Sequence, residues 1–376
     1  MNILGIIVEY NPFHNGHLHH LKEAKKATGA DYVVAVMSGN FLQRGLPACL
    51  DKFTRAKLAL LHGVDIVIEL PVLFATSAAN TFAHGAVSLL NDFGATHICF
   101  GAETPDINML RTVAKENSAV SERVQQGLAT GMSYPRALDC AIDNQVFTPN
   151  NILGIEYLRA IDALGSNIQP IAIQRNTTLK SATSINQQII SSSLHEVCDN
   201  VPTATLQELQ KVAPISLDNF SHIFQYKVAK EKKELAKYLD VDEGLENRII
   251  SKTAEAYNLT ELLTLIKTKR YTMTKLQRMA THILLDITKE DMLKTPTPPY
   301  VKILGMRREA QHLLNSVKAV PLIVNIKSDM TKLSTTGYDL LQKEIFATDL
   351  YHLGIHGHKN SPAPKGLEYT TPLLKI

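Results

Sequence analysis

The sequence of 376 residues has little of what marks zinc-binding, secreted or membrane-spanning proteins. Its four cysteines lie far apart and form no Cys-x-x-Cys pair, so neither a zinc site built on them nor a disulfide framework is indicated. No stretch approaches the roughly 18 apolar residues that a membrane-spanning helix needs. The apolar run Ile3–Val8 is too short for a signal-peptide core and follows no basic segment. We therefore expect a soluble, cytoplasmic protein without a membrane partner.

The net charge is small, at +3, and it is unevenly distributed along the chain. Residues 1–190 carry 14 Lys and Arg against 15 Asp and Glu, whereas the remainder carries 25 against 21. This basic surplus in the second half weakly favours an anionic partner there. The length and the 45% hydrophobic content suffice for a sizeable core and suggest two domains, or one large domain with an appendage.

The first half alternates short Val- and Ile-rich runs with helical patterns. Runs of this kind, close to Gly, Pro or Asn, indicate strands buried on both faces of a parallel sheet. The pattern predicts an α/β fold, a Rossmann-like doubly wound parallel sheet. The predicted strands are Ile3–Val8, Tyr32–Met37, Asp65–Leu70, His97–Phe100 and Pro170–Ile173, and the predicted helices are Leu18–Ala27, Lys52–Leu61, Ala78–Asn91, Pro105–Asp143 and Ile152–Ala163.

After about residue 190 the strand-like runs become rare and amphipathic helical patterns dominate. We predict a nucleotide-binding domain over residues 1–190 and a mainly α-helical domain with a tail over residues 191–376. A proline-rich break at 296–299 precedes the tail, in which Pro321–Ile326 resembles a strand. The predicted helices of this half are Thr205–Val212, Phe220–Leu239, Glu243–Lys267 and Thr274–Thr288.

The first strand runs into the turn His14-Asn15-Gly16-His17 at the start of a helix. Backbone N–H groups at a helix start favour a phosphate, Gly16 allows close approach to the backbone, and two imidazoles can donate hydrogen bonds to phosphate oxygens. The turn has neither the Gly-Lys-Ser/Thr of a P-loop nor three glycines. An incidental His-x-x-His pair and a metal site are the alternatives, but the position after the first strand of an α/β pattern favours phosphate binding.

Several segments, in this order, resemble those of the tRNA(Met) cytidine acetate ligase family, which belongs to the nucleotidyltransferase superfamily with a His-x-Gly-His signature. The resemblance spans nearly the whole chain, and the order and combination of the segments are more specific than any one of them. The segments are 5–20, 38–45, 51–56, 69–71, 100–103, 150–154, 181–185, 269–272 with 276–278, and 303–305.

The resemblance implies an enzyme that activates acetate with ATP as acetyl-AMP and transfers the acetyl group to N4 of the wobble cytidine of elongator tRNA(Met). It also implies which residues bind ATP. From the residues alone, the alternatives are a strand-end glycine for Gly101, a surface arginine for Arg175 and, favoured over nucleotide binding, a helix cap for Asn151. Magnesium is expected with the phosphates, and no metal site made by the protein is expected. The implied ATP-binding residues are Ile7, Val8, Glu9, Tyr10, Asn11, Pro12, Phe13, His14, Asn15, Gly16, His17, Leu18, His19, His20, Gly101, Asn151 and Arg175.

The other implied site residues lie in two loops. Lys180 and Ser181, with His14 and His17, are the predicted catalytic residues, because related enzymes keep a phosphate-gripping loop at this place; the alternative for Ser181 is a helix N-cap. Position 186, where a basic residue is expected after the Ser/Thr cluster, is Asn186. The predicted acetate or cytidine pocket comprises Asn40, Gln43, Arg44 and Lys52, for which a solvated loop is the alternative.

The helical half offers a basic stripe around a tyrosine, which we predict to bind tRNA through phosphate contacts and base stacking. A solvated basic face is the alternative. Two other functions also remain open: a metabolic nucleotidyltransferase that adenylylates a small phosphorylated substrate, and a non-catalytic RNA-binding relative. The predicted tRNA-binding residues are Lys269, Arg270, Tyr271, Lys275 and Arg278.

Overall fold

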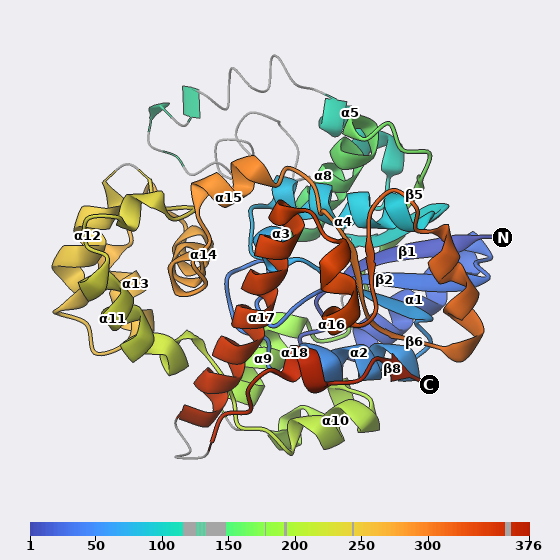
Figure 1. Ribbon diagram of the computed structural model, residues 1–376. Helices are drawn as coiled ribbons and strands as arrows, with labels where there is room; N and C mark the ends of the chain where they lie inside the picture. Colours follow the sequence, from blue (N-terminus) through green and yellow to red (C-terminus); the bar gives the residue numbers. More distant parts are fainter. Residues whose placement is uncertain are drawn as a thin grey trace.

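A mostly parallel sheet forms the centre of the computed structural model (Figure 1). The structure describes residues 1–115, 126–127, 129–130, 132, 148–176, 178–191, 194–242, 244–357 and 362–376. The five strands of the first half lie in the order β5-β4-β1-β2-β3, all parallel, as the sequence predicted. Their bounds are β1 (Ile3–Val8), β2 (Tyr32–Ser38), β3 (Ile66–Leu70), β4 (His97–Ala102) and β5 (Gln169–Gln174).

Helices cover both faces of this sheet, because alternate side chains of each strand point to opposite sides. Val33 and Ala35 of β2 pack with α1 and α2, whereas Val34 and Val36 pack with α4 and α8. The first-half helices are α1 (Asn15–Thr28), α2 (Lys52–Leu61), α3 (Val72–Ala75), α4 (Ala79–Phe93), α5 (Ile107–Lys115), α8 (Pro149–Ala163) and α9 (Ala182–Ile190). Of the predicted helix Pro105–Asp143, α5 is confirmed, and most of the remainder lies outside the described residues.

The tail completes the sheet of the first half. Strand β6 (Val301–Met306) pairs antiparallel with β3, and β7 (Leu322–Ile323) and β8 (Leu374–Lys375) pair with β6. The strand predicted over Pro321–Ile326 is therefore shorter than expected, and neither β6 nor β8 was predicted. Lys302 interrupts the apolar run of β6, so this segment lacks the continuous hydrophobic pattern that predicts a buried strand. The division at residue 190 stays a prediction.

Helices α11 to α15 of the second half gather beside the sheet as a lobe, whereas α10 and α17 contact α2 and α3 of the first half (Figure 1). Two predicted long helices are each broken in two, and Asn258 causes one break because its side chain caps a new helix start. Among the described residues no helix combines the length and apolar character that crossing a membrane requires. The bounds are α10 (Thr203–Leu209), α11 (Ser221–Lys230), α12 (Leu245–Thr253), α13 (Leu259–Ile266), α14 (Met273–Leu284), α15 (Lys289–Lys294), α16 (Ile326–Asp329), α17 (Thr335–His356) and α18 (Leu367–Thr370).

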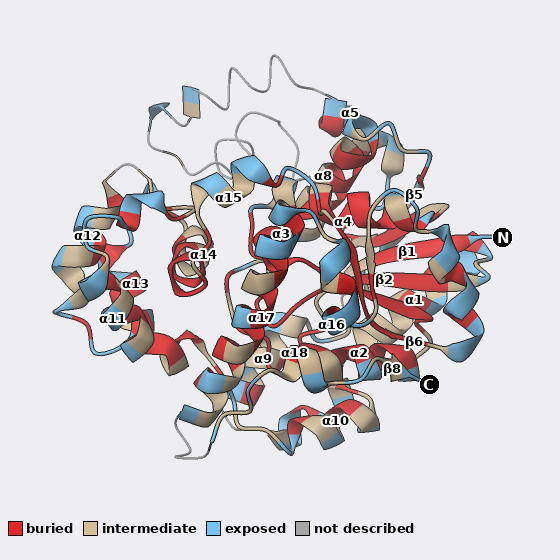
Figure 2. Cartoon of the chain, viewed as in Figure 1, coloured by how far each residue is buried: buried red, intermediate tan, exposed pale blue. Residues whose placement is uncertain are grey.

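Helix α14, largely buried (Figure 2), joins the lobe to the loop that follows β2. Thr281 donates a hydrogen bond to the carbonyl oxygen of Gly45 at 2.6 Å, and the His282 ring lies 3.0 Å from the carbonyl oxygen of Thr76. Gly45 has φ +74°, and a Cβ atom there would lie 2.5 Å from Cα of Arg278. The loop and the helix therefore meet backbone to backbone, which only glycine permits.

We expect Gly45→Ala to destabilise the protein more than Gly29→Ala. Both glycines have positive φ, but nothing lies within 4 Å of a Cβ at Gly29. Gly29→Ala should cost about 1–2 kcal/mol for the left-handed conformation alone, and Gly45→Ala should add about 1–3 kcal/mol for overpacking. Unfolding by urea measures both. Equal losses would show that the contact between the loop and α14 tolerates a side chain.

Candidate functional site

The turn between β1 and α1 holds its two histidines in a reciprocal cap. Nδ1 of His14 accepts a hydrogen bond from the backbone N–H of Gly16 at 3.0 Å, and Nδ1 of His17 accepts one from the backbone N–H of His14 at 3.3 Å. The two rings stack with their centroids 3.7 Å apart. Sequence reasoning found the pair but not this capping box, because Ser, Thr, Asp and Asn are the usual cap residues.

The caps also determine which nitrogen of each ring can donate. Since Nδ1 accepts a hydrogen bond, the proton of each neutral imidazole is on Nε2. Burial, assisted by Arg175, lowers the pKa of His14 to about 4, and burial with the neighbouring His14 lowers the pKa of His17 well below its ordinary value. Both rings are therefore neutral Nε2–H donors at pH 7. Among the described residues, no group of three or more His, Cys, Asp or Glu could hold a metal ion.

Packing around Tyr10 fixes the shape of the turn. Tyr10 has φ +49° and is buried, and its ring contacts Phe13 at 4.7 Å and His17 at 4.9 Å between centroids. The Asn11–Pro12 peptide bond is cis. A non-glycine residue persists at positive φ only where the surroundings impose it, which is common at functional sites.

A buried arginine that the sequence analysis did not assign ties the ends of β1 and β2 together. The guanidinium of Arg55, on α2, donates to the carbonyl oxygens of Glu9 at 2.6 Å, Ser38 at 3.1 Å and Leu50 at 2.9 Å, and also to that of Gly39. Its spacing of four residues from Ala59, on the buried face of α2, was the signal that could have identified it.

The residues predicted to contact ATP beyond the turn gather at the ends of β4 and β5. Asn151 is fully buried in the first turn of α8, and its Oδ1 accepts the backbone N–H groups of Glu103 and Thr104 at 3.0 and 3.2 Å. Its Nδ2 has no hydrogen-bond partner among the described residues. Because α8 begins at Pro149 with Thr148 as N-cap, the alternative that Asn151 is the N-cap is wrong. A buried unpaired donor beside Gly101 suits a nucleotide acceptor.

Glu103, which the sequence analysis did not assign to the site, organises this edge of the sheet. Its carboxylate accepts hydrogen bonds from the side chains of Thr148 and Asn150 at 2.6 Å each, and it lies 3.6 Å from Nη1 of Arg175. Burial opposes its ionisation, but these hydrogen bonds outweigh that effect and lower the pKa of Glu103. The Glu103 carboxylate thus lies beside Arg175 at the end of β5. The positive charge of Arg175 in turn lowers the pKa of His14 in the turn.

The predicted phosphate-gripping loop starts α9. Ser181 is the N-cap of this helix, since its Oγ accepts the backbone N–H of Ser184 at 3.2 Å. Lys180 is exposed and lies 3.5 Å from the side-chain oxygen of Gln188. Asn186, where a basic residue was expected, donates to the carbonyl oxygen of Asn11 at 3.1 Å. Position 186 therefore anchors α9 to the histidine turn, and the catalytic roles of Lys180 and Ser181 stay predictions.

The loop after β2 brings three of the predicted pocket residues to the other side of β1. The backbone N–H of Gln43 donates to Oε1 of Glu9 at 2.8 Å, and the Gln43 side chain donates to the carbonyl oxygen of Ser77 at 3.0 Å. Asn40 is buried, with Oδ1 accepting the backbone N–H of Lys52 at 2.8 Å and Nδ2 without a partner among the described residues. Arg44 is exposed.

Lys52, the fourth predicted pocket residue, lies in a buried ion cluster instead of an open pocket. Its ammonium is 1% exposed and pairs with Glu69 at 2.6 Å and with Glu368, and Lys302 bridges the same two carboxylates at 2.8 and 2.7 Å. Burial opposes ionisation of Glu368, but the two lysines outweigh it and lower its pKa to about 2. This position gives Lys52 a structural role, and direct contact with acetate or cytidine does not fit it.

The basic stripe is partly neutralised within the lobe. Lys275 pairs with Asp242 at 3.0 Å, and Arg278 pairs with Asp240 at 2.9 Å. Tyr271 is only 6% exposed, and its hydroxyl donates to the carbonyl oxygen of Asp242 at 3.3 Å. The base-stacking role predicted for Tyr271 does not fit this core position. Lys269 and Arg270 are exposed.

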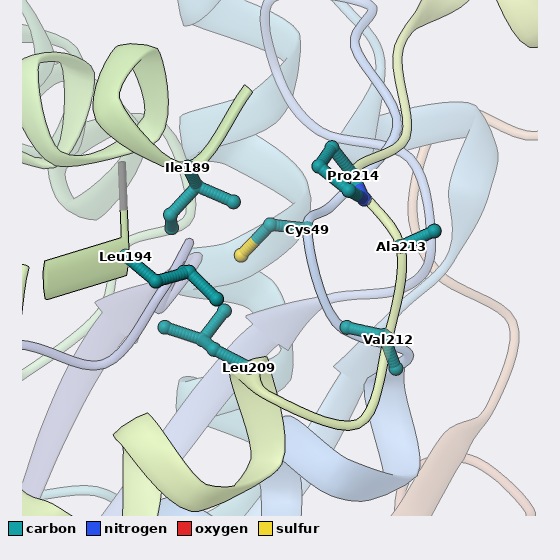
Figure 3. A pocket seen from close by; sticks show the side chains of 7 residues that line it. All are labelled: Cys49, Ile189, Leu194, Leu209, Val212, Ala213 and Pro214. Carbon is teal, nitrogen blue, oxygen red and sulfur yellow. The ribbon is translucent and has the colours of Figure 1, made fainter. Parts of the chain in front are cut away.

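A small apolar cavity of about 70 Å³ lies between α9, α10 and the loop that precedes α2 (Figure 3). Cys49 forms part of its wall, and the backbone N–H of Cys49 donates to Oδ1 of Asn11 at 2.7 Å. Burial raises the pKa of the Cys49 thiol to about 12, so the thiol is neutral. The lining supplies no group that would bind a phosphate or a carboxylate.

His14→Asn should distinguish the helix-capping role of His14 from its role as a hydrogen-bond donor to phosphate. Asparagine caps helices well, so stability should stay near that of the wild type, whereas the loss of Nε2–H should slow ATP–pyrophosphate exchange by about 10²–10³-fold. His14→Ala removes both functions and should also cost about 0.5–2 kcal/mol of stability. Thermal unfolding and exchange assays measure the two effects. Full exchange activity in His14→Asn would rule out the donor role.

Comparison with known proteins agrees with this geometry. The family model described as HIGH Nucleotidyl Transferase matches residues 1–364. The tRNA(Met) cytidine acetate ligase of Thermoanaerobacter sp. is 39% identical over the whole of both chains, and that of Caldicellulosiruptor saccharolyticus is 40% identical over 94% of each. A crystal structure of Thermotoga maritima TmcAL bound with alpha-thio ATP superimposes over the whole of both chains with a TM-score of 0.92 at 31% identity. The chain therefore belongs to the HIGH nucleotidyl transferase family and, within it, to the tRNA(Met) cytidine acetate ligases.

Proposed function

We propose that the protein joins acetate to the α-phosphate of ATP and transfers the resulting acetyl group to N4 of the wobble cytidine of elongator tRNA(Met). The first step forms acetyl-AMP and pyrophosphate, and the second forms N4-acetylcytidine and AMP. The observation that carries this proposal is the pair of neutral Nε2–H donors at the start of α1, in a chain that resembles such ligases from end to end.

The geometry supports a direct attack of acetate on the α-phosphate. Negative charge builds on the phosphate oxygens in this displacement, and the two imidazoles and the backbone N–H groups of α1 can stabilise it. The charge of Arg175, at the end of β5, acts on the same turn. No nucleophile from the protein is needed, since the carboxylate of acetate attacks the phosphate and the amine of cytidine attacks the mixed anhydride. The contribution of the enzyme is positioning and charge stabilisation.

The acceptor RNA is proposed to bind the lobe. Lys269 and Arg270 are exposed just before α14, and α14 packs on the loop after β2 through Thr281 and Gly45. RNA phosphates held by these basic side chains would place the anticodon close to that loop. We further propose that the enzyme acts in the cytoplasm and that magnesium accompanies ATP, coordinated mainly by phosphates and water.

ATP–pyrophosphate exchange tests the activation step without tRNA. We expect exchange that depends on acetate, because acetyl-AMP formation is reversible and needs no acceptor. ATP–pyrophosphate exchange that does not depend on acetate, but does depend on nicotinamide mononucleotide or phosphopantetheine, would assign the protein to the metabolic nucleotidyltransferases. An enzyme that requires bound tRNA for activation would show exchange only when tRNA is added, so that condition is included.

Charge reversal separates tRNA binding from activation. We expect Lys269→Glu with Arg270→Glu to raise the KM for tRNA at least about tenfold, because two cations near the RNA phosphates become anions, while acetate-dependent exchange is unchanged. Lys232→Glu with Lys233→Glu changes the charge of the lobe equally at another exposed pair. Equal increases in the KM for tRNA in the two double variants would refute a specific tRNA site before α14. They would indicate that tRNA responds only to the overall positive electrostatic potential of the lobe.

A further inference from the structure

Glu9 occupies a position between the nucleotide side and the acceptor side of the site. It follows the last residue of β1, and the strand order β5-β4-β1-β2-β3 divides the site at this strand. Gly101 and Arg175 lie at the ends of β4 and β5, whereas Gln43 and Arg44 follow β2. The nucleoside of acetyl-AMP would occupy the β4 side, so an acceptor must approach the acyl group from the β2 side.

The carboxylate of Glu9 turns toward the β2 side. Its Oε1 accepts the backbone N–H of Gln43 at 2.8 Å, and its own carbonyl oxygen accepts Nη1 of Arg55 at 2.6 Å. The side chain remains partly exposed. Among the described residues, no ion pair within 4 Å engages this carboxylate, in contrast to Glu69 and Glu368 in the ion cluster. Glu9 is thus not locked in an ion pair as Glu69 and Glu368 are, although the charges of Arg55 and Arg44 act on it, and this makes it a candidate for chemistry.

The surroundings of Glu9 favour a proton acceptor that is stronger than an ordinary carboxylate. Burial raises its pKa, and the Gln43 hydrogen bond with the charges of Arg55 and Arg44 opposes this effect only in part. Tyr157 faces it from α8, and the pKa of that phenol is raised by burial and by Glu9, so the phenol is neutral at pH 7. Among the described residues, the charged and titratable groups that act on Glu9 include Arg55 on α2, Arg44 in the loop and Tyr157 on α8.

Other groups near this edge are unsuited to the task. The Nδ1 atoms of His14 and His17 accept backbone N–H groups, and their Nε2 atoms already carry protons. Asn40 and Gln43 are amides, and Arg44 is a cation. Asp51 caps α2 through the backbone N–H groups of Phe53 and Thr54.

We propose that Glu9 is the general base of acetyl transfer, accepting the proton that N4 of the acceptor cytidine loses. This role rests on the proposed function. The N4 lone pair attacks the carbonyl carbon of acetyl-AMP, and a C–N bond forms. The bond between that carbon and the phosphate oxygen then breaks, and AMP leaves with the electron pair. The N4 proton passes to the Glu9 carboxylate and from there to solvent, so that acetyl-AMP and cytidine give N4-acetylcytidine, AMP and one proton.

The test compares the two half-reactions in Glu9→Gln, which keeps the shape of the side chain and an oxygen for the Gln43 N–H. Because Glu9 is also among the residues predicted to contact ATP, acetate-dependent exchange without tRNA is measured in the same variant, and it should lose at least about tenfold less than transfer does. Single-turnover transfer from enzyme-bound acetyl-AMP to tRNA should slow by about 10²–10⁴-fold. The wild-type transfer rate should rise with pH through the pKa of Glu9, since only the carboxylate form accepts a proton, and this rise should be absent in Glu9→Gln. Glu9→Asp should restore part of the rate together with the rise.

Glu103→Gln serves as the matched control on the nucleotide side, where loss of the carboxylate should lower exchange as well as transfer. Equal loss of both half-reactions in Glu9→Gln would instead make Glu9 a nucleotide-positioning residue and overturn the proposal. Unchanged transfer, or a pH rise that persists in Glu9→Gln, would overturn it too. Failure of the proposed function itself is distinguishable, because wild-type enzyme would then show no acetate-dependent exchange with or without tRNA.

Discussion

The buried ion cluster of Lys52, Glu69, Lys302 and Glu368 holds together elements that are far apart in the sequence. It joins the start of α2 and the end of β3 to β6 and α18. Removing one member of a buried pair leaves an uncompensated charge and typically costs about 3–5 kcal/mol. Because the backbone N–H of Lys52 also fixes Asn40, the cluster positions the loop after β2. The acceptor side of the site thus depends on the tail of the chain.

A third acid, Glu344 on α17, explains how this cluster is charge-balanced. Two lysines face three carboxylates, and burial together with the nearby Glu69 raises the pKa of Glu344 well above its ordinary value. Oε1 of Glu344 accepts a hydrogen bond from the backbone N–H of Val72, and a neutral carboxyl group can accept this bond as well. With Glu344 protonated, the remaining charges cancel, which a buried site requires.

The sequence predicted the first-half sheet and the histidine turn well, because parallel strands and helix starts leave local signals. It could not predict contacts made over long distances in the sequence. Lys52 was assigned to a substrate pocket because its ion-pair partner Glu368 is 316 residues away in the sequence. Tyr271 was assigned to base stacking because nothing in the sequence shows its burial against α12 and Asp242. The missed Arg55 lies at helical spacing with the buried Ala59, but its four carbonyl partners, which lie at the ends of β1 and β2 and just before α2, leave no local signal.

The order of charges along the site follows from the two steps it must support. The first step brings the anion acetate to the anion ATP, so the nucleotide side must offer donors and positive charge, which the imidazoles and Arg175 provide. The carboxylate on that side, Glu103, is hydrogen-bonded by Thr148 and Asn150, and Arg175 lies 3.6 Å away and offsets its charge. The second step releases a proton, and it needs an acceptor where the amine arrives. Glu9 lies on the β2 side of β1, so the base is near the acyl group. The positive charges of Arg44 and Arg55 lie close to Glu9 and shield acetate from the negative charge of Glu9.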